Sequence, residues 1–149
     1  MKKIFPLLFL LLTTWLVSAQ NVVTNTEQFP VFPACKNLIY QELESCFYNQ
    51  VQDFVYNNFQ VPEDLKTTNY KGSIIVLFEV NQEGQFKTIY IDTNEDRLSQ
   101  EAKNVFGQMP KIEPATYNGN PTYAKYTLKI AIPLKSAADI AKEQEQIRI

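Results

Sequence analysis

The segment 72–92 has the pattern of a strand, a tight turn and a second strand, and it constrains the fold more than any other stretch. β-Branched and aromatic residues dominate GSIIVLFEV at 72–80 and FKTIYID at 86–92, as is typical of strands. Between them, Asn81 can bond its own backbone, and Gly84 tolerates positive φ. Strands joined by so short a turn must pair antiparallel. We therefore expect a β-hairpin with Gly84 at positive φ.

Two segments have the periodicity of amphipathic helices. The first runs from Cys46 until Pro62 stops it, and the second begins near Asn94 or Asp96, either of which could cap it, and ends before Pro110. Their apolar positions are Phe47, Val51, Phe54, Val55 and Phe59 in the first helix, and Leu98, Ala102, Val105, Phe106 and Met109 in the second.

The clearest single strand of the sequence is predicted at 123–132. One face carries Ala124, Tyr126, Leu128, Ile130 and Ile132, and the other carries Tyr123, Lys125, Thr127 and Lys129. Before it lies a loop with Asn118 and Gly119, where we expect Tyr117 and Tyr123 to be exposed. The order of the segments predicts an α+β two-layer sandwich, in which a small antiparallel three-stranded sheet packs with two helices.

The two ends of the chain are assigned separately from this domain. Residues 1–19 have the charged start, apolar run and small residues of a secretory signal peptide. The alternative is an uncleaved membrane anchor, but the apolar run contains Pro6 and is shorter than the roughly 20 residues that span a bilayer. We expect a short extended lead-in at 20–33, one domain at 34–135 and a polar tail at 136–149. Ser136 and Asp139 could form a capping box, so the tail either docks as a short helix or frays.

Composition excludes several function classes. Without Lys2 and Lys3 of the leader, 12 basic residues face 16 acidic ones, so a nucleic-acid partner is not expected. The chain has no histidine and no Gly-rich phosphate loop, so we predict neither an enzyme nor a small-molecule cofactor. Asp92, Asn94 and Asp96 alternate as in a calcium loop. However, Arg97 stands where that loop needs glycine and Lys103 where it needs glutamate, so no metal site is expected.

The two cysteines, Cys35 and Cys46, admit three interpretations. A catalytic thiol usually needs a neighbouring base, most often a histidine, and this chain has no histidine. Structural zinc needs about four ligands, which two cysteines do not supply alone. A disulfide suits an exported protein and would close a short loop, so we predict that Cys35 and Cys46 are bonded to each other.

Several of these motifs together resemble a known family. FPVFPACKN at 29–37 is followed by Cys46, by GSIIVLFEVNQEGQF at 72–86, and by LSQEAKNVFGQMPKIEPATYNGNPTYAKYTLKIAIPL at 98–134. In this order and spacing they resemble the C-terminal domain of TonB-type energy transducers, in the version common in Bacteroidetes-type envelopes. The resemblance covers Phe29 to Leu134. It departs from the family pattern at Ala34, where glycine is usual.

The resemblance implies a domain that binds partner proteins by adding their extended peptide to a sheet edge, with outer-membrane transporters as the partners of full transducers. Such transducers also have an uncleaved membrane helix with a histidine that meets the motor, and a long Pro-rich spacer. This chain has no histidine, and only Asn21 to Ala34 could serve as a spacer. We therefore expect a stand-alone binding module, periplasmic or secreted. The alternatives are a short transducer tethered to the inner membrane, and an envelope enzyme or inhibitor with an unrecognised site.

The strand at 123–132 is the expected binding edge. An edge strand exposes unpaired backbone groups to which an extended peptide can bond. Tyr123, Lys125, Thr127 and Lys129 are the expected contact residues, and the two lysines could select a segment that bears carboxylates. The alternative is that these lysines only keep an edge strand from aggregating.

Overall fold

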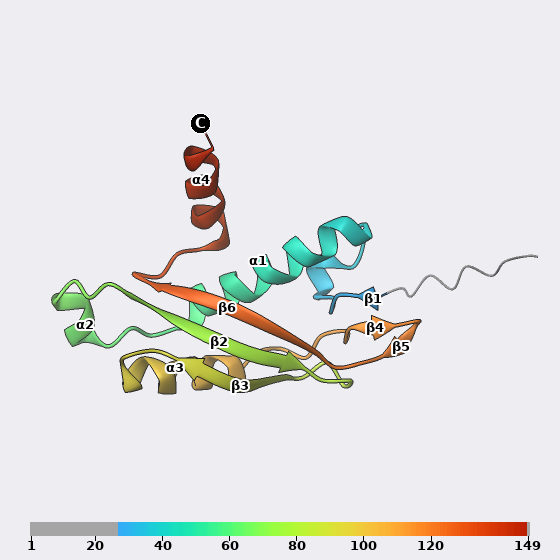
Figure 1. Cartoon of the computed structure of the whole chain (residues 1–149), viewed down its shortest axis with the longest axis horizontal. Helices are drawn as coiled ribbons and strands as arrows, with labels where there is room; N and C mark the ends of the chain where they lie inside the picture. Colours follow the sequence, from blue (N-terminus) through green and yellow to red (C-terminus); the bar gives the residue numbers. More distant parts are fainter. Residues whose placement is uncertain (1–26, 149) are drawn as a thin grey trace, which may run out of the picture.

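The main sheet consists of three antiparallel strands in the order β3-β2-β6 (Figure 1). The computed structural model describes residues 27–148, so the expected signal peptide lies outside the described residues. The strands are β2 (Gly72–Val80), β3 (Phe86–Asp92) and β6 (Ala124–Ile132), close to the predicted bounds. The α+β class is confirmed.

Two helices cover one face of this sheet. α1 (Tyr40–Asn58) contributes Phe47 and α3 (Asp96–Gly107) contributes Phe106. Both rings contact Phe78 of β2, with ring centroids 6.3 and 5.0 Å away, respectively. Because Phe47, Phe78 and Phe106 are all fully buried, the core lies between the helices and this face. The result is the predicted two-layer arrangement.

The helices differ from the prediction in three details. α1 begins at Tyr40 instead of Cys46, and its added turns bury Leu43 one turn before the apolar stripe that the sequence shows. Neither Asn94 nor Asp96 caps α3, because Glu95 is the residue at that position. A short helix, α2 (Glu63–Thr67), was not predicted and begins directly after Pro62. Figure 1 shows it at the end of the sheet away from β1.

A second, smaller sheet joins the lead-in to the segment before β6. Its strands are β1 (Glu27–Gln28), β4 (Thr116–Tyr117) and β5 (Asn120–Pro121), in the order β1-β4-β5. Asn118 and Gly119 connect β4 and β5 with φ of 51° and 78°, the double positive φ of a type I′ turn. The segment predicted as a loop therefore contains a hairpin.

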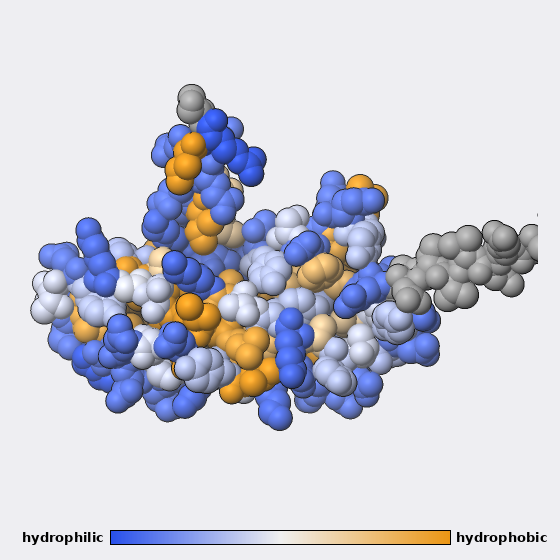
Figure 2. Space-filling model, in the orientation of Figure 1, coloured by the Kyte–Doolittle hydropathy of each residue, from blue (hydrophilic) through white to orange (hydrophobic). Residues whose placement is uncertain are grey.

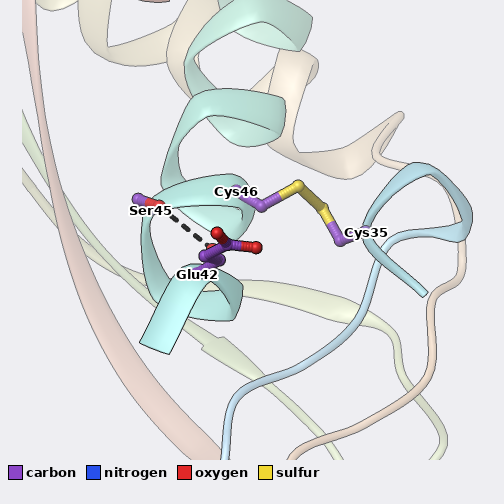
Figure 3. Close-up of a disulfide and its surroundings, with 4 residues drawn as sticks. All are labelled: Cys35, Glu42, Ser45 and Cys46. Carbon is purple, nitrogen blue, oxygen red and sulfur yellow. Dashed lines mark hydrogen bonds between the residues drawn. A yellow bond between two sulfur atoms is a disulfide. The ribbon is translucent and has the colours of Figure 1, made fainter. Parts of the chain in front are cut away.

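The predicted disulfide is present and ties the segment directly after the lead-in to α1 (Figure 3). Cys35 ends a short 3-10 helix, η1 (Pro33–Cys35), and Cys46 lies in the second turn of α1. Their Cα atoms are 6.0 Å apart, within the usual range for a disulfide. Both sulfurs are used in this bond, so the described chain has no free thiol for catalysis or metal binding.

Gly84 has the expected positive φ, at 79°. Its N–H donates to the carbonyl of Asn81 at 2.9 Å, while the side-chain oxygen of Asn81 accepts from the N–H groups of Glu83 and Gln85. The Gly84 carbonyl in turn accepts from the N–H of Ile112 at 3.0 Å. The turn is thus bonded to the segment between α3 and β4, a contact that the sequence does not reveal.

The polar tail forms a helix, α4 (Ala137–Ile147), which projects from the rest of the domain (Figure 1). Ser136 and Asp139 form the predicted capping box. Two side chains of α1 hold its base: the Asp53 carboxylate accepts from the N–H of Ala137 at 2.8 Å, and the Gln52 amide donates to the carbonyl of Lys135 at 2.6 Å. None of the helix's own side chains is buried. α4 is therefore docked at one end only.

Replacing the capping serine should loosen α4 without affecting the sheet. We expect Ser136→Ala to reduce the stability of α4 by about 1 kcal/mol, since N-cap deletions usually cost that much. Faster amide exchange confined to 137–147 would show it. Ser45→Ala is the matched control, because Ser45 lies inside α1, where its hydroxyl donates to the Glu42 carbonyl (Figure 3). Equal exchange in α4 of both variants would contradict the expected role of the cap.

Candidate partner-binding edge

β6 forms one edge of the main sheet and, among residues 27–148, pairs with no strand other than β2. The register is regular over all 9 residues of the strand, from Ala124 opposite Val80 to Ile132 opposite Gly72. The other edge, β3, has a bulge where the register shifts between Leu77 and Phe78, and β3 also contacts α3. Bulges interrupt the ladder that an added strand would extend, so β6 is the edge better suited to accept one.

The bonding of the β2–β3 hairpin shows which backbone groups of β6 point away from β2. Asn81, directly after β2, donates its N–H to Gln85 on the β3 side at 3.0 Å. Since successive residues of an antiparallel strand direct their backbone groups to opposite sides, the even-numbered residues of β2 face β6. These pair in register with the even-numbered residues of β6. Consequently the N–H and C=O groups of Lys125, Thr127 and Lys129 point to the free edge.

The side chains of the same three residues lie on the face of the sheet opposite the helices, and all three are exposed. Within residues 27–148, neither Lys125 nor Lys129 forms an ion pair. Ile75 lies opposite Lys129 in register and is itself 39% exposed. Figure 2 shows hydrophobic side chains over the middle of this sheet. The edge thus offers two unpaired cations beside a partly apolar surface.

Tyr126 occupies the helix side of β6 and is half-buried. Its ring lies 4.7 Å from that of Phe47 and 5.8 Å from that of Phe29. Burial, with smaller contributions from Tyr48, Glu27 and Glu44, raises the pKa of its phenol. The hydroxyl of Tyr126 therefore stays protonated and can donate a hydrogen bond at any physiological pH.

A pocket of about 270 Å³ lies next to the first residues of β6, and we call it the β1–β6 slot. It is lined by Glu27, Gln28, Phe29, Tyr40, Tyr123, Ala124, Lys125 and Tyr126. The sequence predicted Tyr123 and Lys125 as site residues but missed the lining from β1 and α1. Tyr117 and Tyr123 are exposed, as expected, at 46% and 60%. Only Tyr123 of these two lines the slot.

The fold is that of a small α+β domain in which helices cover one face of a sheet that has one regular free edge. The model of the family described as Gram-negative bacterial TonB protein C-terminal matches residues 57–131. The chain belongs to this family. Domains of this family are non-enzymatic, periplasmic interaction domains that act with outer-membrane transporters.

The matched range covers β2, β3, α3 and nearly all of β6, whereas the disulfide, most of α1 and α4 lie outside it. No curated protein and no solved structure matches the chain. In the part of the chain that the structure describes, no helix is long and apolar enough to cross a membrane. Among the same residues, no cluster of potential ligands could hold a metal ion.

Proposed function

We propose that this protein is a periplasmic binding module that captures an extended segment of a partner protein, in the first place an outer-membrane transporter, as an added strand on β6. The observation that carries the proposal is the free edge of β6, where backbone groups of Lys125, Thr127 and Lys129 point away from β2. Main-chain hydrogen bonds to an added strand supply affinity, and alternate side chains supply specificity.

The unpaired lysines indicate the charge of that segment. Lys125 and Lys129 lie on one face of β6, so carboxylates at alternate positions of the added strand would meet both of them. The rival explanation, that the lysines only prevent edge-to-edge aggregation, requires no such complementarity. The two explanations differ in what the lysines do to the salt dependence of binding.

The module would bind without transducing energy. The transducers that the sequence resembles use a histidine in a membrane helix to meet the motor, and this chain contains no histidine. Cleavage of residues 1–19 would release the domain into the periplasm. The alternative is a tethered transducer, and N-terminal sequencing of the native protein distinguishes the two. A chain that begins at Met1 in the inner-membrane fraction would exclude the free module.

Proline at position 127 tests the edge directly. Because the N–H of Thr127 points to the free edge, Thr127→Pro removes a donor for the partner without removing a bond to β2. The probe is a fluorescent synthetic peptide of alternating valine and aspartate, measured by fluorescence polarisation. We expect proline to abolish binding and the matched control Thr127→Val, which keeps the N–H, to retain it. Undiminished binding by a folded Thr127→Pro protein would place the site elsewhere.

The double variant Lys125→Gln, Lys129→Gln tests the charge. We expect weaker binding of the valine–aspartate peptide and an affinity that depends less on salt, because the variant lacks two electrostatic attractions that salt weakens. A matched peptide with asparagine in place of aspartate should bind both proteins about equally. If the double variant binds the acidic peptide with the same affinity and salt dependence as the parent protein, the lysines serve solubility alone.

A further inference from the structure

The β1–β6 slot lies on the free-edge side of β6. Tyr123 and the first three residues of β6, 124–126, line it in an unbroken run, although side chains in a strand alternate between the two faces of the sheet. A pocket that contacts consecutive residues of a strand lies beside the strand and not over one of its faces. Since β2 occupies one side and contributes no lining residue, the pocket lies on the other side, along the free edge.

The opposite wall of the slot is the free edge of the small sheet. Both residues of β1, Glu27 and Gln28, line the pocket, whereas β4, which pairs with β1 on its other side, does not. Figure 1 shows β1 at the same end of the molecule as the start of β6. The slot is thus bounded by two strands, each of which has one edge that pairs with no other strand of the described residues. A further extended strand is the shape that fits between them.

Aromatic rings from three segments line the slot. Phe29 and Tyr126 are in ring contact with each other, at 5.8 Å between centroids. Tyr40, at the start of α1, and Tyr123, just before β6, are 50% and 60% exposed, so neither is needed for the core. Aromatic pairs stabilise one another beyond the burial of their area, and exposed tyrosines are typical of binding surfaces.

We propose that the segment added to β6 extends into the β1–β6 slot and places an aromatic side chain among these four rings. This inference rests on the proposed function, and it deepens that function by naming the chemistry of the partner. In an extended segment, residues on the helix side alternate with residues on the outer face, where Lys125 and Lys129 lie. The recognised segment therefore combines an aromatic residue at its slot end with carboxylates at the alternate positions.

The slot is formed before any partner arrives. β1 is paired with β4, and Val31 exchanges both backbone bonds with Glu113, at 2.9 and 3.2 Å. On the α1 side, the disulfide fixes the first turns of the helix that carries Tyr40. A preformed site binds more tightly because less ordering is needed upon association.

Synthetic peptides distinguish this inference from the edge proposal. The base peptide alternates valine and aspartate, and its two derivatives carry phenylalanine or alanine at the terminal position that reaches the slot. Because the direction of the added strand is not fixed by the structure, each substitution is made at either end in turn. We expect phenylalanine at one of the two ends to tighten binding about tenfold relative to alanine.

Tyr40→Ala is the decisive variant, since Tyr40 lies outside β6 and leaves the edge intact. We expect it to remove most of the preference for phenylalanine while the affinity for the alanine peptide stays unchanged. Tyr117→Ala is the matched control, because Tyr117 is similarly exposed, at 46% compared with 50% for Tyr40, but does not line the slot. This variant should keep the full preference.

The outcomes separate the two proposals. If the peptides bind and Thr127→Pro abolishes binding, but phenylalanine gives no advantage at either end, the slot inference is wrong and the edge proposal stands. The slot inference is also wrong if Tyr40→Ala and Tyr117→Ala keep equal preferences. If no peptide binds the parent protein, or if Thr127→Pro binds them undiminished, the edge proposal fails and the slot inference fails with it.

Discussion

Gly84→Ala is expected to lower the free energy of unfolding by about 3–5 kcal/mol, the sum of an unfavourable backbone conformation and a broken buried contact. Gly84 has φ of 79°, which residues with a Cβ rarely adopt. A Cβ atom on it would also overlap the carbonyl oxygen of Ile112. Because Ile112 is buried and bonded to Gly84 through its N–H, the backbone there cannot move aside easily. Urea denaturation monitored by circular dichroism measures the loss.

Gly119→Ala is the matched control for this prediction. Gly119 has nearly the same φ, 78°, but a Cβ there would meet no atom within 4 Å. Its substitution should therefore show the conformational cost alone, about 1 kcal/mol. Equal losses in the two alanine variants would mean that the contact between the turn and Ile112 does not contribute to stability.

Removal of the disulfide is expected to cost about 3 kcal/mol of unfolding free energy. Cys35 and Cys46 are 11 residues apart in sequence, so their bond restricts the unfolded chain and closes a short loop. Cys35 is only 1% exposed. The double variant Cys35→Ala, Cys46→Ala is preferable to serine, since a hydroxyl at the position of Cys35 would be buried.

The parent protein in reductant provides the matching measurement. It should lose about as much stability as the double alanine variant, and reductant should not affect that variant. Hydrogen exchange should locate the change in η1 and in the first turns of α1, the two segments that the bond joins. If reduction leaves the urea midpoint of the parent protein unchanged, the disulfide does not stabilise the fold.

The parts of the fold that local sequence determines were predicted well. β2 and β3 were found because strand periodicity and the Asn81–Gly84 turn are encoded within one short segment. The first turns of α1 were missed because Leu43 is their only buried residue, too little for a recognisable period. β1, β4 and β5 have two residues each, too few for a recognisable strand period, and β1 is defined by its pairing with the distant β4.

The candidate site was predicted only in part, because only some of its residues belong to a pattern that is visible in the local sequence. The alternation in 123–132 separates Lys125, Thr127 and Lys129 from the buried positions without any knowledge of the partner strand. The slot could not be predicted, because it forms where β1 and the start of α1 approach β6 from far away in sequence.

The position of β6 in the sheet has a consequence for the order of folding. β2 and β3 are joined by a tight turn, so their pairing requires only a short loop closure, whereas β6 must return to β2 across β3, α3 and the small sheet. Contacts between distant segments form more slowly, so we expect the hairpin to form first and β6 to arrive late. Until then the nascent chain presents the edge of β2, to which an extended segment from another chain could pair in place of β6. β6 is thus the first strand to add to a free edge of the hairpin, and a strand from a partner protein can add only afterwards, to β6 itself.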